Sequence, residues 1–245
     1  GQTYTRKLDY RVVQALTGLA QSGHKFANDL RLLQHMKEVE EPFEKHQVGS
    51  SAMAYKRNPM RSERMTALAR HLIVLVLDPA LTAAEQWFER TLDDSANKRL
   101  SVPEAFLTAD VMLEIYLNVS QNMVVYPAVI EAHLKSELPF MATENLMMEA
   151  VKLGGDRQEV HERIRQHSQA AAEQVKLHGK PNDLLERVAK DPTFARLARD
   201  LHHFMDPSRY VGLSAEQTTD FLRRQVQPVL RAHKDWLGQQ GVVTV

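Results

Sequence analysis

The sequence contains no cysteine, which excludes disulfides and thiolate metal sites. It also has no net charge, because 31 Lys and Arg residues balance 31 Asp and Glu residues. Without a basic excess there is no electrostatic case for general nucleic-acid binding. The longest apolar run, Leu72 to Leu77, is too short to cross a bilayer, and no signal peptide is visible at the start. These absences predict a cytoplasmic protein with no nucleic-acid or membrane partner.

Several motifs for cofactors and metals are missing as well. The sequence has no Gly-rich phosphate loop, no dinucleotide fingerprint and no His-Glu-x-x-His pair. The adjoining His202 and His203 are expected to lie on a helix and point to different sides. We therefore expect neither a metal site nor a cofactor.

Apolar or small residues recur with a helical period at the start of the chain. The positions are Leu8, Val12, Leu16, Leu19, Gly23, Phe26, Leu30 and Leu33. The mean step of about 3.6 residues predicts a helix from about Thr5 to Lys37. A helix of this length does not normally cover itself in a small globule, which favours an extended bundle shared between subunits.

The rest of the chain also predicts helices, and no strand alternation is present. A second helix is expected to start near Met60 and to kink or restart at Pro79. The segment 105–119 is apolar on nearly every face, as at the centre of a bundle. Beyond residue 125, shorter amphipathic helices alternate with turn signals, and Ser214-x-x-Gln217 resembles a capping box that opens a last helix. The fold prediction is all-α, with a helical-bundle domain over 1–125 and a smaller helical domain over 126–245.

The polar stretch 49–64 is the strongest candidate for chemistry. It opens with Gly-Ser-Ser, and its cations and amide are followed by a carboxylate. The groups that carry charge or donate hydrogen bonds are Lys56, Asn58, Arg61, Glu63 and Arg64. Such a loop can close over an anion and hold a hydroxyl near cations, as enolate-type chemistry requires. The alternative is a solvated basic loop that caps a helix.

A second polar stretch, 87–99, has two readings. Arg90, Lys98 and Arg99 could form an exposed ion-pair cluster with the neighbouring aspartates. Alternatively, two guanidinium groups and the hydroxyl of Ser95 near a helix start would suit a phosphate monoester.

The order and spacing of Gly, Ser, Ser, Met, Lys, Asn and Pro in residues 49–59 resemble the signature loop of the fumarase/aspartase superfamily, taken here as 47–60. The stretch 87–95, Trp-Phe-Glu-Arg-Thr-Leu-Asp-Asp-Ser, narrows the resemblance to the C-terminal half of the adenylosuccinate lyase family. The resemblance implies release of fumarate from adenylosuccinate to give AMP. It also implies the parallel cleavage of the succinylated aminoimidazole carboxamide ribotide in purine biosynthesis. A homotetramer with active sites shared between subunits is implied too.

The resemblance also implies a role for each matching residue. Ser50 would be the general base, Lys56 and Asn58 would hold the succinyl carboxylate, and Glu63 would orient a histidine from another segment. Gln2 and Arg64 match substrate-contacting positions, while Arg90, Ser95 and Arg99 match the group that grips the 5′-phosphate. Ala54 stands where the family usually has proline.

The general-acid histidine belongs to the family's N-terminal portion, so we expect these 245 residues alone to be inactive. Two alternatives stay open at the level of sequence. One is another superfamily lyase, such as argininosuccinate lyase, and the other is a non-catalytic helical assembly module.

Overall fold

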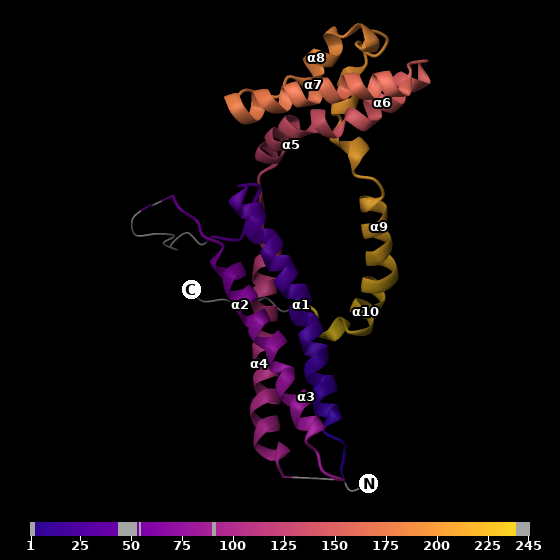
Figure 1. Cartoon of the computed structure of the whole chain (residues 1–245). Coiled ribbons are helices and arrows are strands. Elements are labelled where there is room, and N and C mark those ends of the chain that lie inside the picture. The colour runs from indigo at the N-terminus through magenta and orange to yellow at the C-terminus, as the bar shows by residue number, and fades with distance from the viewer. Residues whose placement is uncertain (1–2, 44–52, 54, 90–91, 239–245) are drawn as a thin grey trace. The chain divides into compact units, whose positions relative to one another are not determined.

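The computed structural model describes residues 3–43, 53, 55–89 and 92–238. The chain divides into two compact units, one comprising Gly1–Tyr126 with Gly238–Val245 and the other comprising Pro127–Leu237. Figure 1 shows the helices of each unit. The all-α prediction is confirmed, because the only strands in the described ranges are two of two residues each.

The first unit is a helical bundle. Its helices are α1 (Lys7–His35), α2 (Met60–Leu75), α3 (Leu77–Ala84) and α4 (Asp94–Gln121). Strand β1 (Val39–Glu40) pairs antiparallel with β2 (Val124–Val125). In Figure 1, α1, α2 and α4 run alongside one another, and their buried residues form one core.

The buried face of α1 is displaced from the periodic row of large apolar residues. The buried residues are Val13, Thr17, Ala20, Gly23, Ala27, Leu30 and Gln34. Leu8 and Leu19, which belong to the periodic row, are exposed. Close packing explains the difference, since a Cβ on Gly23 would lie 3.1 Å from the Met112 sulfur of α4. Small residues let these helices approach, while Leu8 and Leu19 remain on the outer face.

The break between α2 and α3 agrees with the prediction made from Pro79. This proline lies in the first turn of α3, where its missing N–H leaves no helical hydrogen bond unmade. The segment Met60–Ala84 contains an 18-residue window with a mean hydropathy of 1.5, which is long and apolar enough for a membrane span by length and composition. Length and composition alone are weak grounds for a span. Met65, Ala69 and Leu72 of α2 are buried in the core of the bundle, which is the packing of a core helix.

The second unit consists of shorter helices. They are α5 (Pro127–Met141), α6 (Thr143–Lys152), α7 (Arg157–His178), α8 (Leu184–Lys190), η1 (Pro192–Phe194), η2 (Leu201–Met205), η3 (Pro207–Tyr210), α9 (Ser214–Phe221), the π-helical turn η4 (Leu222–Val226), α10 (Gln227–Ala232) and η5 (Lys234–Trp236). The Asp156 carboxylate caps α7 by accepting hydrogen bonds from two backbone N–H groups. The helix ends at Gly179, whose φ of 61° is the left-handed conformation that favours glycine.

Two local predictions for this unit are wrong. Ser214 does not cap α9, because it is the first helical residue and its carbonyl oxygen accepts a hydrogen bond from the Thr218 hydroxyl. His202 and His203 do not point to different sides, since their ring centroids are only 4.0 Å apart. They lie in the 3₁₀-helix η2, whose geometry differs from the α-helix on which the prediction was based.

Candidate active site

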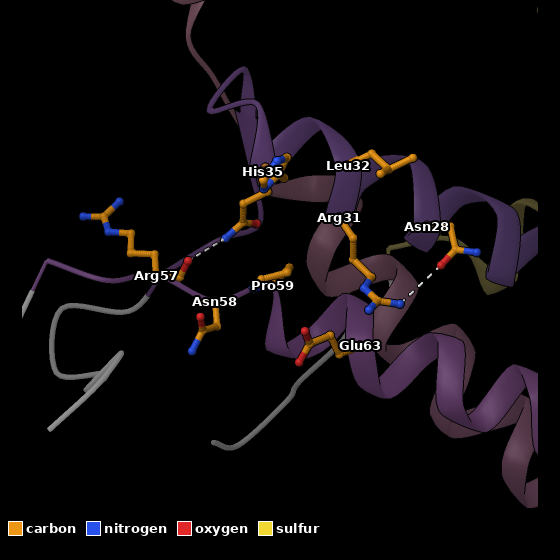
Figure 2. Close-up of a pocket in the computed structure, with 9 residues that line it drawn as sticks. Asn28, Arg31, Leu32, His35, Arg57, Asn58, Pro59 and Glu63 are labelled. Carbon is orange, nitrogen blue, oxygen red and sulfur yellow. Dashed lines mark hydrogen bonds between the residues drawn. The ribbon is translucent and has the colours of Figure 1, made fainter. Parts of the chain in front are cut away.

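A pocket of about 610 Å³ lies between the C-terminal turns of α1 and the start of α2. Figure 2 shows the side chains around it. The lining residues are Asn28, Arg31, Leu32, Gln34, His35, Arg57, Asn58, Pro59 and Glu63. Polar and charged side chains from three segments therefore converge on one cavity.

The first turn of α2 is closed by partners within the protein. The backbone N–H groups of Arg61 and Ser62 each donate to the Glu41 carboxylate over 2.9 Å. The N–H of Glu63 donates to the Pro59 carbonyl oxygen over 2.8 Å, and that of Met60 donates to Asn58. Because these donors are already used, the helix start does not offer the free N–H groups of an anion site. Charge in the pocket must come from side chains.

Arg31 supplies a cation to the pocket. One guanidinium nitrogen donates to the Asn28 amide oxygen over 3.3 Å and to the Thr66 hydroxyl over 3.4 Å. Both acceptors are neutral, and in the described part of the chain no carboxylate lies within 4.0 Å of this guanidinium. Figure 2 shows Arg31 on α1 and Glu63 on α2, which both line this pocket. The pocket thus combines a cation without a carboxylate partner, a carboxylate and an amide.

The structure brings together two of the site residues expected from the polar stretch 49–64. Asn58 and Glu63 both line the pocket. Lys56 and Arg64, which flank these two residues in the sequence, are exposed and do not line the pocket. Ser50, the expected general base, lies outside the described residues, as do Gln2 and Arg90.

The expected phosphate-binding residues lie elsewhere in the first unit. Arg99 donates to the Ser95 hydroxyl over 2.7 Å and also to the Ser95 carbonyl oxygen. Both residues belong to the start of α4, at the opposite end of the bundle from the start of α2 (Figure 1). The 16 residues of α2 span about 24 Å, which separates the start of this helix from the start of α4. The two clusters of one chain do not form a single site.

The ion-pair reading of the second stretch is correct for one of its aspartates. Asp94 contacts the Arg6 guanidinium at 3.2 Å and the Lys98 ammonium at 3.9 Å. Arg99 has no carboxylate within 4.0 Å among the residues that the structure covers. Its charge is therefore available to a ligand, whereas that of Lys98 is partly compensated.

Sequence reasoning missed Asn28, Arg31 and His35. These positions lie three and four residues apart, so they share one face of α1. A polar stripe at helical spacing, just before a candidate loop, is the signal that could have identified them. Across the described ranges, no group of three or more His, Asp or Glu residues is placed to hold a metal ion.

A carboxylate beside the pocket ties the loop to the end of the bundle. Glu40 accepts hydrogen bonds from the Tyr126 hydroxyl over 2.8 Å and from Arg57 over 3.1 Å. The hydrogen bond to Glu40 raises the pKa of Tyr126, and burial adds to this effect. Arg57 also lies over the Phe43 ring, 4.9 Å from its centroid. These contacts hold Arg57 on the side of the loop that leads into α2.

Comparison with known proteins connects this geometry to a family. The sequence model described as "Adenylosuccinate lyase C-terminus" matches residues 139–221, and the one described as "Lyase" matches residues 3–73. Three of the similar curated proteins are named adenylosuccinate lyase. The one from Saccharomyces cerevisiae is 53% identical over 242 residues, which cover 99% of this chain and 50% of that protein. The one from Schizosaccharomyces pombe is 50% identical, over 99% of this chain and 50% of that protein. The one from Schistosoma mansoni is 45% identical, over 100% of this chain and 51% of that protein.

Solved structures agree at the level of the fold. The fumarate lyase from Mesorhizobium sp. BNC1 matches with a TM-score of 0.72 and 22% identity, covering 90% of this chain and 48% of that chain. The 3-carboxy-cis,cis-muconate lactonizing enzyme from Pseudomonas putida matches with a TM-score of 0.70 and 23% identity, covering 85% of this chain and 45% of that chain.

The relatives named adenylosuccinate lyase are far more similar than these structural neighbours, so argininosuccinate lyase is not favoured. The chain spans about half the length of the curated relatives it matches. The family match extends over nearly all of its residues, and the chain belongs to the adenylosuccinate lyase family.

Proposed function

We propose that this chain is part of a carbon–nitrogen lyase that releases fumarate from adenylosuccinate to give AMP. The same site would cleave the succinylated aminoimidazole carboxamide ribotide in purine biosynthesis. The observation that carries the proposal is the pocket, where Asn58 of the signature loop and Glu63 of the first turn of α2 lie with the Arg31 cation. A cation and amide donors suit a dianionic substrate end, and relatives of 45–53% identity point to this reaction.

The reaction requires a base and fixed positive charge. The Ser50 hydroxyl, as alkoxide, takes a proton from the succinyl carbon next to a carboxylate, which then carries nearly two negative charges. Lys56, Asn58 and Arg31 stabilise that charge, and one such donor typically contributes about 3–4 kcal/mol to lowering the barrier. The electron pair then forms the double bond of fumarate as the C–N bond breaks. The departing nitrogen receives a proton from a histidine in the N-terminal portion.

The remaining residues orient the substrate and the acid. Glu63 is exposed toward the pocket, where its carboxylate would orient the catalytic histidine of another segment. Gln2 and Arg64 contact the substrate in this proposal. Arg90, Ser95 and Arg99 bind the 5′-phosphate, for which the guanidinium geometry is well suited.

The distance between the two clusters favours active sites shared between copies. The nucleotide is too small to bridge the length of the bundle. A second copy must therefore bring the start of its α4, called the Arg99 end because it carries Arg99, to the pocket of the first. Leu100, Leu107 and Val111 form an exposed apolar row on α4 that such a copy would cover. We propose a cytoplasmic homotetramer that includes the N-terminal portion of the polypeptide. The 245 residues alone would be inactive, and turnover by them in isolation would contradict this.

The test uses the complete polypeptide and measures fumarate release. Ser50→Ala is expected to lower kcat by about 100- to 10,000-fold, because it removes the base. Ser51→Ala is the matched control, since it removes the neighbouring hydroxyl and should cost far less. The assembly mass of both variants should equal that of the wild type. An unchanged rate for Ser50→Ala would transfer the role of base to another group.

A further inference from the structure

Glu41 joins the parts of the chain on the two sides of the signature segment, which is the signature loop of residues 47–60. Its carboxylate is buried and accepts three hydrogen bonds, from the Arg61 N–H, the Ser62 N–H and the Ser62 hydroxyl, at 2.9, 2.9 and 3.0 Å. Glu41 precedes the segment, whereas Arg61 and Ser62 open the helix that follows it. A negative charge at a helix start is favoured by the helix dipole, and these charge-assisted bonds satisfy a carboxylate that burial would otherwise penalise.

Gln34 makes a second connection between the same ends. Its amide oxygen accepts from the Glu41 backbone N–H over 3.2 Å, and its amide nitrogen donates to the Arg57 carbonyl oxygen over 3.3 Å. Gln34 is buried on the last turn of α1. One side chain therefore fixes Glu41, before the segment, and Arg57, near the segment's end, to the helix that carries Arg31.

A third connection comes from Arg61, whose side chain is almost fully buried. Its guanidinium donates to the Pro42 carbonyl oxygen over 2.6 Å. Buried polar groups that satisfy one another are costly to disrupt, because each partner that is removed leaves another unsatisfied. The network therefore has one well-defined arrangement. Two of its members, Arg57 and Ser62, directly precede Asn58 and Glu63 in the chain.

We infer that Glu41 and Gln34 are positioning residues that set where Asn58 and Glu63 stand relative to Arg31 in the pocket. The inference rests on the proposed function, because positioning is measured through turnover. Glu41 does not line the pocket, and Gln34, which does line it, uses both its amide oxygen and its amide nitrogen in hydrogen bonds to the backbone. They act by holding the backbone on either side of the signature segment against the end of α1. A displacement of about 1 Å at reacting groups can lower a rate by about 100-fold.

The experiment uses Glu41→Gln in the complete, assembled polypeptide. The amide preserves shape but removes the charge and replaces one acceptor oxygen by a donor facing backbone N–H groups. We expect kcat to fall by about 10- to 100-fold with a much smaller change in KM. Glu41→Asp keeps the charge and should restore part of kcat. If Glu41→Gln does not assemble, Gln34→Met is used instead. It removes the second connection and should also lower kcat.

The matched control is Asp191→Asn in the second unit. Asp191 is also a buried carboxylate that accepts from a backbone N–H, that of Thr193 over 2.9 Å, but it lies outside the pocket. This variant should lose thermal stability without losing kcat per assembled molecule. Hydrogen exchange of residues 57–63 is measured in parallel, and should accelerate in Glu41→Gln but not in Asp191→Asn.

The outcomes separate the two proposals. Faster exchange at 57–63 together with a kcat loss that Glu41→Asp partly restores supports the positioning role. Faster exchange with unchanged kcat overturns it, and so does a loss of turnover that only follows the loss of assembled protein. A wild-type protein that releases no fumarate from either succinylated ribotide refutes the proposed function itself, whatever the exchange shows, and the positioning role with it.

Discussion

The two units use similar helices in different ways. In the first unit, the core contacts involve many small residues, including Ala20, Ala27, Ala69, Ala105 and Ala109, while large apolar residues such as Leu107 remain exposed. In the second unit, the core includes Leu146, Leu184, Phe194 and Phe204, which are all buried. The first unit thus leaves large apolar side chains such as Leu107 exposed, whereas α5–α8, η1 and η2 bury large side chains among themselves.

Their buried carboxylates differ in the same way. Glu41 bonds to residues 20 and 21 positions later and lies next to a pocket with unpaired charge. Asp191 caps the short helix that it precedes and is held by His167 and Arg163 of α7. Substitutions in the first unit should therefore change assembly or turnover, while those around Asp191 should change stability alone.

The largest effect should come from placing a charge on the exposed apolar row of α4. Leu107→Glu is expected to reduce the assembly to smaller species and to abolish turnover, because a charge buried without a partner is strongly disfavoured. Native mass measurement and fumarate release test this together. Glu104→Gln on the same helix is the control, since Glu104 is exposed and pairs with His71. A Leu107→Glu protein of unchanged mass and rate would show that no copy covers this row.

A smaller effect is expected at the start of α4. Arg99→Ala should raise KM by about 10- to 100-fold with little loss of kcat, because a charged hydrogen bond to a phosphate is worth about 1.5–3 kcal/mol. Lys98→Ala is the matched control, as Lys98 already faces Asp94. Steady-state kinetics with adenylosuccinate distinguish the two. Equal KM values for both variants would remove Arg99 from phosphate binding.

The smallest effect is expected at Asp191 and concerns stability alone. Burial would raise the pKa of its carboxyl, but hydrogen bonds from His167, from Thr193 and from Arg163 outweigh this and lower the pKa to about 2. Because the pKa is lower in the folded state, the carboxylate stabilises the fold above its ordinary pKa of 3.8, and this stabilisation is lost as the pH falls toward about 2. Asp191→Asn should lower the free energy of unfolding by about 2 kcal/mol at neutral pH.

Thermal unfolding as a function of pH measures this difference. The gap between wild type and Asp191→Asn should narrow between about pH 4 and pH 2, since protonation removes the same charge that the substitution removes. A gap that stays constant with pH would mean that the hydrogen bonds of His167 and Arg163 to this carboxylate contribute nothing.

The sequence was sufficient for much of the fold. The helical period predicted α1, and Pro79 predicted the break before α3. It did not predict which side of α1 is buried, because contact with α4 at Gly23 depends on packing between helices that are distant in sequence. The Ser214 cap failed for a local reason, since the motif matched in composition but the helix begins at Ser214 itself.

The site was predictable only in part. Asn58 and Glu63 belong to a motif with fixed spacing, so the sequence identified them. Arg31 and Gln34 come from a different helix, where Arg31 belongs only to a polar stripe at helical spacing and Gln34 carries no local signature. Glu41 forms its bonds 20 residues away, and no pattern of composition indicates such a partner. Residues that contact through tertiary structure are therefore the ones that the sequence could not reveal.

The central claim is that the pocket of one chain and the Arg99 end of another form one active site. It is tested most directly by co-assembling two complete polypeptides, one carrying Glu63→Gln and the other Arg99→Ala, at substrate concentrations below KM. Mixed assemblies should release fumarate several times faster than either variant alone, because some sites then contain both intact ends. Co-assembly of Glu63→Gln with Ser50→Ala, two changes on the same side of the site, should give no such gain. A Glu63→Gln and Arg99→Ala mixture no faster than the average of its components would contradict the account.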